Sequence, residues 1–185
     1  MIIGITGTDG AGKGSAVEYL KTQGYTHYSV RSLIVAEIEK RGLEVHRPNM
    51  KLIGNAMRAE RGGAVMVKTA AETAAQAGIT DFVVESIRTV EEVQLLHEYK
   101  GVLLAVDADQ RVRYDRIYNR GSESDKVTFA EFVEQDEAES KSENTAEQNK
   151  VAVMQMADHV IANNGTLAEL EQQVEQWLNT LPKNT

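Results

Sequence analysis

Residues 7–15 of the chain, Gly-Thr-Asp-Gly-Ala-Gly-Lys-Gly-Ser, combine the residue types that bind phosphate groups. The glycines permit consecutive backbone N–H groups to converge on phosphate oxygens without a clash from a Cβ atom. Lys13 adds an ammonium group that reaches the transferable phosphates. The alternative is a glycine-rich turn that binds nothing, but the lysine and its spacing favour a phosphate-binding loop. The loop is predicted to bind phosphate through Gly10, Ala11, Gly12, Lys13, Gly14 and Ser15.

The segments on either side of this loop are those that a phosphate loop requires. Residues 1–6 form a short apolar run that predicts a buried β-strand, and residues 16–20 predict the first turns of a helix. The N-terminus of that helix would add its partial positive charge where a phosphate binds. The order strand, loop, helix therefore agrees with the chemistry of the loop.

Apolar strand-like runs alternate with helical patterns along the rest of the chain. Further strands are predicted at residues 25–30, 81–85, 101–107 and 157–162. Three threonine and glutamate pairs have the spacing of a capping box, which predicts helix N-termini at Thr89, Thr128 and Thr166. A polar turn at residues 47–49 is predicted to precede a helix from Met50 to about Arg61.

Five strands separated by helices predict an α/β fold with a five-stranded parallel sheet and helices on both faces. Ligands bind to such sheets at the carboxyl ends of the strands. The length of 185 residues predicts a single domain over residues 1–185.

The composition limits the function classes. The chain has no cysteine, which excludes disulfide bonds and cysteine-based zinc sites. The formal net charge of −8 argues against broad binding of nucleic acid. The apolar runs are too short to span a bilayer. We therefore expect a cytoplasmic protein with no nucleic-acid or membrane partner, and the oligomeric state stays open.

The ends of the other strands supply candidate partners for the loop. Glu85 ends the third predicted strand, where a carboxylate would hold Mg²⁺ through water or accept a proton. Arg88, three residues later, would reach the same cleft with a guanidinium suited to phosphate. The alternatives are a solvated glutamate and a surface arginine. Arg58 and Arg61 would serve the phosphate of an acceptor or form a solvated face.

An arginine stripe lies on the helix predicted after the fourth strand. Arg113, Arg116 and Arg120 recur at a spacing that places them on one helical face. Phosphoryl transfer needs such cations, because charge develops on the transferred group. The alternative is that these arginines pair with acidic residues of the following helix.

Together these segments resemble the P-loop nucleoside and deoxynucleoside monophosphate kinases, with relatives in dephospho-CoA kinase and archaeal adenylate-kinase-related proteins. Residues 12–15, Gly-Lys-Gly-Ser, look like the loop of adenylate kinases, and residues 9–13 are similar to the loop of thymidylate kinases. Residues 85–88, Glu-Ser-Ile-Arg, resemble the segment that ends the third strand in the family. The resemblance covers nearly the whole chain and implies a three-layer P-loop kinase fold with a short lid.

The resemblance also implies roles for individual residues. Arg88 matches the arginine that binds the acceptor phosphate, and Asp9 matches an acidic residue that contacts the acceptor sugar. Gly14 replaces the usual Ser or Thr, so Ser15 contacts a phosphate or, with Glu85, holds Mg²⁺ through water. Arg116 and Arg120 match the arginines that open the lid. Asn163, Asn164 and Gly165 match the segment whose turn packs against adenine. Residues 31–77 would bind the acceptor, with Arg58 on its phosphate, and residues 116–144 would form the lid.

The resulting expectation is a kinase that moves the γ-phosphoryl group of MgATP to a nucleoside or deoxynucleoside monophosphate. Lys13, Arg88, Arg116 and Arg120 are its expected catalytic residues, with ATP as co-substrate and Mg²⁺ as cofactor. Two alternatives stay open. One is a hydroxyl kinase like dephospho-CoA kinase, with Asp9 as the base, and the other is a nucleotide-binding regulatory module without catalysis.

Overall fold

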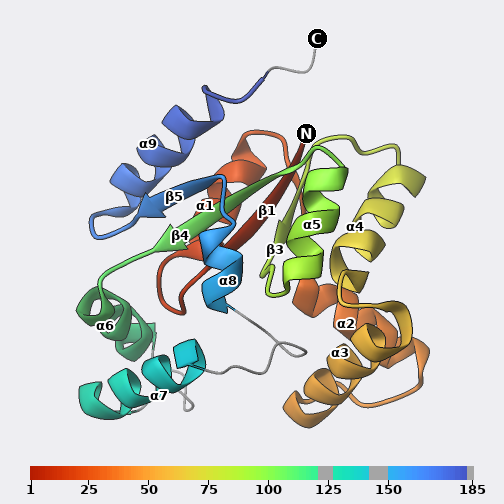
Figure 1. The fold of residues 1–185 in the computed structure, drawn as a ribbon, viewed down its shortest axis with the longest axis horizontal. Helices are drawn as coiled ribbons and strands as arrows, with labels where there is room; N and C mark the ends of the chain where they lie inside the picture. The colour runs from red at the N-terminus through yellow and green to blue at the C-terminus, as the bar shows by residue number, and fades with distance from the viewer. Residues whose placement is uncertain (121–126, 142–149, 183–185) are drawn as a thin grey trace.

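The computed structural model describes residues 1–120, 127–141 and 150–182. Its strands and helices alternate along the chain, except that three consecutive helices follow the second strand and, in the described residues, three follow the fourth (Figure 1). In chain order they are β1 Ile2–Gly7, α1 Lys13–Thr22, β2 Thr26–Ser29, α2 Val30–Lys40, α3 Arg47–Arg61, α4 Val65–Gln76, β3 Phe82–Glu85, α5 Val90–Glu98, β4 Val102–Asp107, α6 Gln110–Arg120, α7 Phe129–Lys141, α8 Lys150–Gln155, β5 His159–Ala162 and α9 Leu167–Leu178.

The five strands form one parallel sheet in the order β2-β3-β1-β4-β5. β1 lies at the centre, with Ile5 opposite Glu85 of β3 and Thr6 opposite Ala105 of β4. The predicted α/β fold with five parallel strands is therefore confirmed. Because β1 is central, the loop that follows it opens in the middle of the carboxyl edge of the sheet.

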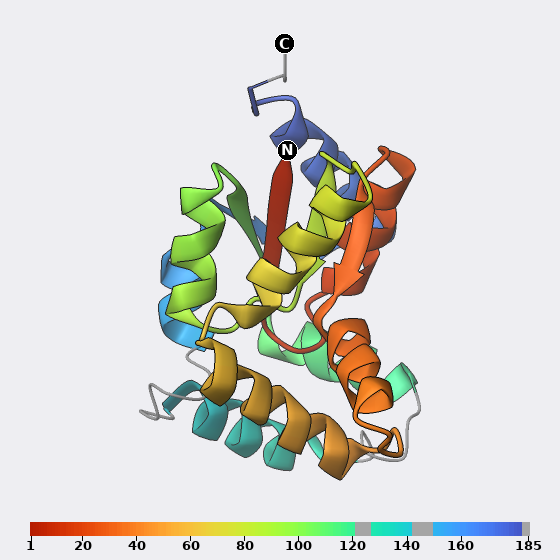
Figure 2. The same cartoon turned by 90° about the vertical axis from the view of Figure 1, so that its right-hand side faces the viewer.

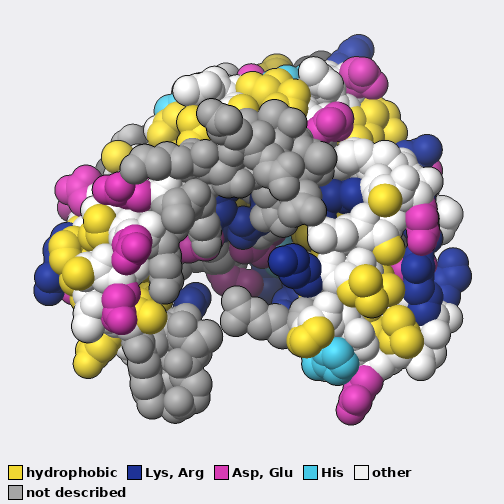
Figure 3. Space-filling view, turned by 60° about the horizontal axis from the view of Figure 1, so that its bottom comes forward, with side chains coloured by type: hydrophobic (Ala, Val, Ile, Leu, Met, Phe, Trp, Pro, Cys, Tyr) yellow, Lys and Arg dark blue, Asp and Glu magenta, His cyan; other side chains and the backbone are white. Residues whose placement is uncertain are grey.

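Helices cover both faces of the sheet (Figures 1 and 2). α1 and α9 pack together on one face, whereas α4, α5 and α8 pack on the other. Two further pairs, α2 with α3 and α6 with α7, lie beyond the carboxyl ends of the strands. Figure 3 shows this end of the molecule, where Lys and Arg side chains gather in a central hollow.

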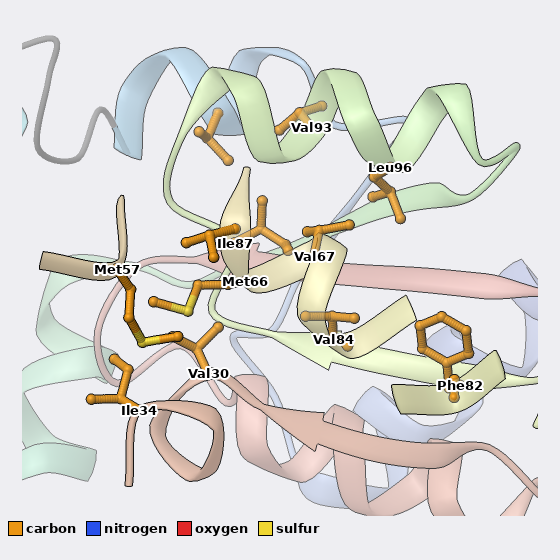
Figure 4. Close-up of a cluster of buried hydrophobic side chains, with 14 of the residues drawn as sticks. Val30, Ile34, Met57, Met66, Val67, Phe82, Val84, Ile87, Val93 and Leu96 are labelled. Atoms are coloured by element: carbon orange, nitrogen blue, oxygen red, sulfur yellow. The ribbon is translucent and has the colours of Figure 1, made fainter. Parts of the chain in front are cut away.

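The side chains of β3 show how alternation divides the core into two parts. Phe82 and Val84 face α2–α5, in a cluster that also holds Met57 and Met66 (Figure 4). Val83, between them, faces the α1 and α9 side. Successive residues point to opposite faces of a strand, so a short fully apolar strand is buried on both sides.

The helix N-termini agree with the capping predictions at Thr89, Thr128 and Thr166, where the threonine hydroxyl accepts a backbone N–H and the glutamate three residues later accepts the threonine N–H. The predicted start of α3 at Met50 is wrong, because the helix already begins at Arg47. Pro48 fits the first turn, where its missing N–H group costs nothing, and the His46 side chain caps the helix through the Asn49 N–H. Of the predicted lid, residues 121–126 and 142–144 lie outside the described residues.

Candidate functional site

The loop between β1 and α1 has the backbone shape of a phosphate loop. Gly7, Gly10 and Gly12 adopt φ angles of 140°, 82° and 103°, which favour glycine. A Cβ at Gly12 would collide with the amide of Asn163. At Gly14, a Cβ would meet no atom within 4 Å. The first three glycines are thus demanded by the fold, whereas Gly14 borders open space at the start of α1.

Lys13 lies folded back over this loop. Its Nζ donates to the carbonyl oxygens of Gly7, at 3.0 Å, and Thr8, at 2.8 Å, and lies 3.5 Å from Asp9 Oδ1. The side chain is 13% exposed, and burial lowers the pKa of the ammonium group although Asp9 opposes this. The cation is therefore held in place before any ligand arrives.

The Asp9 carboxylate gathers two more cations. Lys150 Nζ on α8 lies 3.3 Å from Oδ2, and Arg88 Nη2 lies 3.8 Å from Oδ1. Burial alone would raise the pKa of Asp9, but Lys150, Lys13 and Arg88 lower it below its usual value. Sequence reasoning missed Lys150, because it lies far along the chain in no recognisable motif and only the packing of α8 on β1 brings it here.

The three cations also border one small pocket at the carboxyl ends of β1 and β3. It is lined by Thr6, Gly7, Lys13, Ser86, Ile87, Arg88 and Lys150. The structure thus brings together the loop and Arg88, as the sequence predicted, and adds Lys150.

The segment after β3 is fixed to the central strand. Ile87 N donates to the carbonyl oxygen of Ile5 at 3.0 Å, and Thr6 Oγ1 donates to the carbonyl oxygen of Ile87 at 2.9 Å. Ser86 has a φ of 70°, a left-handed conformation that costs free energy for a residue other than glycine. Glu85 lies 3.2 Å from His27 Nε2, and this contact lowers the pKa of Glu85.

The backbone of Arg88 and the side chain of Arg58, the two arginines predicted to bind the acceptor, contact one buried carboxylate. Glu92 is 0% exposed, and its Oε2 accepts the N–H groups of Arg88, at 2.7 Å, and Thr89, at 3.2 Å. Arg58 Nη2 of α3 lies 3.9 Å from Glu92 Oε1, and the Arg58 side chain is 10% exposed. Burial raises the pKa of Glu92. The sequence identified Glu92 only as a capping residue, because its second role depends on α3.

The arginine stripe of α6 serves different purposes along its length. Arg113 is buried and forms a two-bond ion pair with Asp136 of α7, at 2.6 and 2.8 Å. Pairing with the following helix, the alternative left open for the stripe, therefore holds for Arg113. Arg116 donates to the carbonyl oxygens of Asn163 and Gly165 at 2.9 and 3.0 Å. Arg120 ends α6 and is exposed, directly before residues outside the described part of the chain.

The turn after β5 packs on the phosphate loop. Asn163 is buried, and its Nδ2 donates to the Ala11 carbonyl oxygen at 2.7 Å. Asn164 Oδ1 accepts the N–H group of Asp109 at 2.7 Å. The predicted adenine-binding residues thus lie beside the loop, and Arg116 links the two segments.

The described residues contain no group of three or more His, Cys, Asp or Glu side chains that could hold a metal ion. Mg²⁺ needs few protein ligands, because it keeps several waters and binds chiefly to nucleotide phosphates. Ser15 in the first turn of α1 and Glu85 at the end of β3 are the predicted residues that would hold such an ion, with water molecules between them and the ion. In the same part of the chain, no helix is long and apolar enough to cross a membrane.

Comparison with known proteins agrees with this geometry. Residues 3–142 match the model of a family described as an AAA domain. The chain belongs to this family. It is also 31% identical to a UPF0200 protein of Pyrococcus horikoshii over 100% of this chain and 99% of the relative. A UPF0200 protein of Methanocaldococcus jannaschii is 33% identical over 74% of this chain and 71% of the relative.

Solved structures show the same fold at low sequence identity. The protein TT1252 of Thermus thermophilus aligns with a TM-score of 0.63 at 20% identity, covering 99% of this chain and 98% of that chain. Shikimate kinase of Aquifex aeolicus aligns with a TM-score of 0.57 at 13% identity, covering 97% and 96%. The chain therefore has the P-loop kinase fold that its sequence predicted.

Proposed function

We propose that this protein is an ATP-dependent phosphotransferase that moves the γ-phosphoryl group of MgATP to a nucleoside or deoxynucleoside monophosphate. The observation that carries the proposal is the cluster of cations at the carboxyl ends of β1 and β3. There the loop lysine, Lys13, and the predicted acceptor arginine, Arg88, line the same space. The P-loop kinase fold supports the same reaction class.

The proposed reaction joins an acceptor phosphate to the γ-phosphorus. An oxygen of the acceptor's phosphate attacks that phosphorus, the bond to the β–γ bridging oxygen breaks, and ADP and a nucleoside diphosphate result. The backbone N–H groups of the loop would bind the triphosphate, and Lys13 would stabilise the charge that develops on the transferred group. Mg²⁺, when bound through the phosphates with Ser15 and Glu85, would neutralise further charge.

The arginines would divide the two substrates between them. Arg88, whose backbone N–H donates to Glu92, and Arg58, whose guanidinium lies beside the same carboxylate, would bind the acceptor's phosphate. Arg116 and Arg120 of α6 would act on the transferring group. Asn163–Gly165 would lie against adenine, and Asp9 would accept a hydrogen bond from the acceptor sugar.

A phosphate acceptor fits the electrostatics better than a hydroxyl acceptor does. A hydroxyl must lose a proton, and Asp9 is the carboxylate at the loop that could take it. Before a nucleotide binds, the cations Lys150, Lys13 and Arg88 outweigh the burial of Asp9 and lower its pKa, which makes it a weak base. A phosphate oxygen is already ionised and needs no base.

The test is a coupled assay of ADP release with MgATP and a panel of nucleoside monophosphates, deoxynucleoside monophosphates and dephospho-CoA. We expect turnover with one or more monophosphates. Turnover with dephospho-CoA alone would replace the proposal by a hydroxyl kinase. Nucleotide binding without ADP release for any acceptor would indicate a regulatory module.

A further inference from the structure

The carboxylate of Asp9 contacts the lysine of the phosphate loop. In such loops the lysine reaches the phosphates of the nucleotide. Here Lys13 Nζ instead contacts the loop carbonyls and Asp9 Oδ1. Lys150 and Arg88 approach the same carboxylate from α8 and from the segment after β3. One carboxylate thus unites cations from three separate parts of the chain.

The exposure of these side chains suits an exchange of anions. The three cations are largely enclosed, with side-chain exposures of 13% for Lys13, 17% for Lys150 and 27% for Arg88. Asp9 is 48% exposed. A carboxylate and a phosphate offer the same kind of oxygen acceptor to ammonium and guanidinium groups, and a phosphate carries more charge and more oxygens. The exposed carboxylate is therefore the member of the cluster that can leave.

We infer that Asp9 acts as a stand-in for phosphate, which holds Lys13, Arg88 and Lys150 together until the phosphates of a bound nucleotide replace it. On this exchange Lys150 becomes a ligand of the phosphates, a catalytic residue that none of the predicted motifs contains. The inference rests on the proposed function and deepens it, because it adds a residue and a displacement step to the same site.

The position of Lys150 gives the exchange a structural consequence. α8 packs on β1, α5 and α7, and Lys150 is its first residue. A phosphate bound by Lys150 would therefore be held from the α7–α8 side of the hollow, whereas Lys13 and Arg88 hold it from the central strands. A purely structural ion pair between Lys150 and Asp9 predicts no change in phosphate binding when either side chain is replaced.

Binding of pyrophosphate, which has no base or sugar, tests the inference by isothermal titration calorimetry. We expect Lys150→Ala to weaken binding about tenfold or more and Asp9→Asn to tighten it by a similar factor, since close charge pairs are coupled by such amounts. In the double variant the gain from Asp9→Asn should be smaller than in the parent background, because one of the three cations that the substitution releases is missing. Lys68→Ala, which removes an exposed lysine of α4, is the matched control and should bind as the parent does.

The double variant separates a stand-in from a merely nearby negative charge. If Asp9→Asn tightens binding equally with and without Lys150, or if Lys150→Ala binds as the parent does, the inference is overturned. Lys150→Arg keeps the positive charge and should retain most of the affinity for pyrophosphate. If circular dichroism shows that the Lys150→Ala variant does not fold, Lys150→Gln takes its place in the measurement. A parent that binds no pyrophosphate overturns the phosphate site itself. A parent that binds pyrophosphate but releases no ADP overturns the proposed function alone, and the variants still decide the inference.

Discussion

Lys13 and Lys21 lie on the same helix in very different surroundings. Lys13 donates to two loop carbonyls and is largely buried, whereas Lys21 is half exposed and pairs with Glu18 at 2.8 Å. A buried ammonium beside a phosphate loop interacts strongly with developing charge, because little water screens it. An exposed pair contributes little to any property of the protein.

Replacing Lys13 should therefore affect turnover rather than folding. We expect Lys13→Ala to lower kcat by a factor of about a hundred or more in the ADP-release assay. Circular dichroism should show an unchanged fold, since Lys13 contacts no part of the apolar core. Lys21→Ala is the control and should behave as the parent. A folded Lys13→Ala variant with near-normal turnover would contradict the assignment of the loop.

Substitutions of the arginines at the two sides of the hollow should change different kinetic parameters in initial-rate measurements. Arg88→Ala should raise the KM for the acceptor about tenfold or more with a smaller change in kcat, because a charge-assisted contact to the acceptor is lost. Arg116→Ala and Arg120→Ala should chiefly lower kcat, by up to about a thousandfold, because they act on the transferring group. Arg111→Ala, an exposed arginine of α6, is the control. Parent-like kinetics in all three variants would contradict the division of roles.

At the scale of elements, the ion pair between Arg113 and Asp136 joins α6 to α7. Arg113 is 6% exposed and also donates to the carbonyl oxygen of Ala108. The pair therefore sets how α7 packs beside the phosphate loop. Removing one member would leave a buried charge without its partner, which costs far more than the loss of an exposed pair.

We expect Asp136→Asn to lower the free energy of unfolding at pH 7 by about 3 kcal/mol, measured by urea denaturation. The hydrogen bonds from Arg113 lower the pKa of Asp136 in the folded protein. As the pH falls, the Asp136 carboxylate is therefore protonated in the unfolded chain, near the usual pKa of about 3.9, before it is protonated in the folded protein. The stabilisation by the ion pair is complete above that pH. The difference between parent and variant should shrink as the pH falls further, through the lowered pKa of the folded state.

Asp115→Asn provides the matched control for this measurement. Asp115 pairs with Arg111 on the surface of α6, and both side chains are at least half exposed. Its removal should cost about 0.5 kcal/mol or less at any pH. If the two substitutions lowered the free energy of unfolding equally, the buried α6–α7 ion pair would contribute no more stability than an exposed pair.

At the scale of the whole molecule, the hollow lies between two helix pairs that depend on different parts of the sheet. α2 and α3 pack with α4 on one side, and on the other side α6 packs with α7, which packs with α8. Basic side chains face the hollow between them (Figure 3). A polyanionic ligand in this hollow would contact groups from both sides and would stabilise the folded protein as a unit.

Thermal unfolding should report this stabilisation. At a concentration of MgADP near a hundred times its Kd, the folded state gains about 2.7 kcal/mol, which raises the Tm of a chain of this size by about 5–10 °C. Adenosine at the same concentration lacks the phosphates and should raise the Tm much less. Equal shifts with adenosine and MgADP would place the main contacts on the base and contradict the phosphate site.

Local spacing was enough to predict several features of the fold. The glycines of the loop, the capping residues Thr89 and Thr166, and the alternation within the strands are local properties, because each depends on neighbours a few residues away. Together they predicted the α/β class and the position of the loop at the carboxyl edge of the sheet. The start of α3 was misplaced, since Pro48 is compatible with both a turn and a first helical turn.

The pairing of distant side chains was decided only by the tertiary structure. Residue type and spacing cannot show that Lys150 meets Asp9, because this contact depends on α8 packing against the central strand. Nor can they show that Arg113 forms an ion pair with Asp136, whereas Arg116 donates hydrogen bonds to the turn after β5. The reason is that a parallel sheet joins strands through long crossovers, so the loops at its carboxyl edge become neighbours according to strand order rather than chain order. The sequence by itself determined the phosphate loop and the elements around it, and the strand order decided which charges surround that loop.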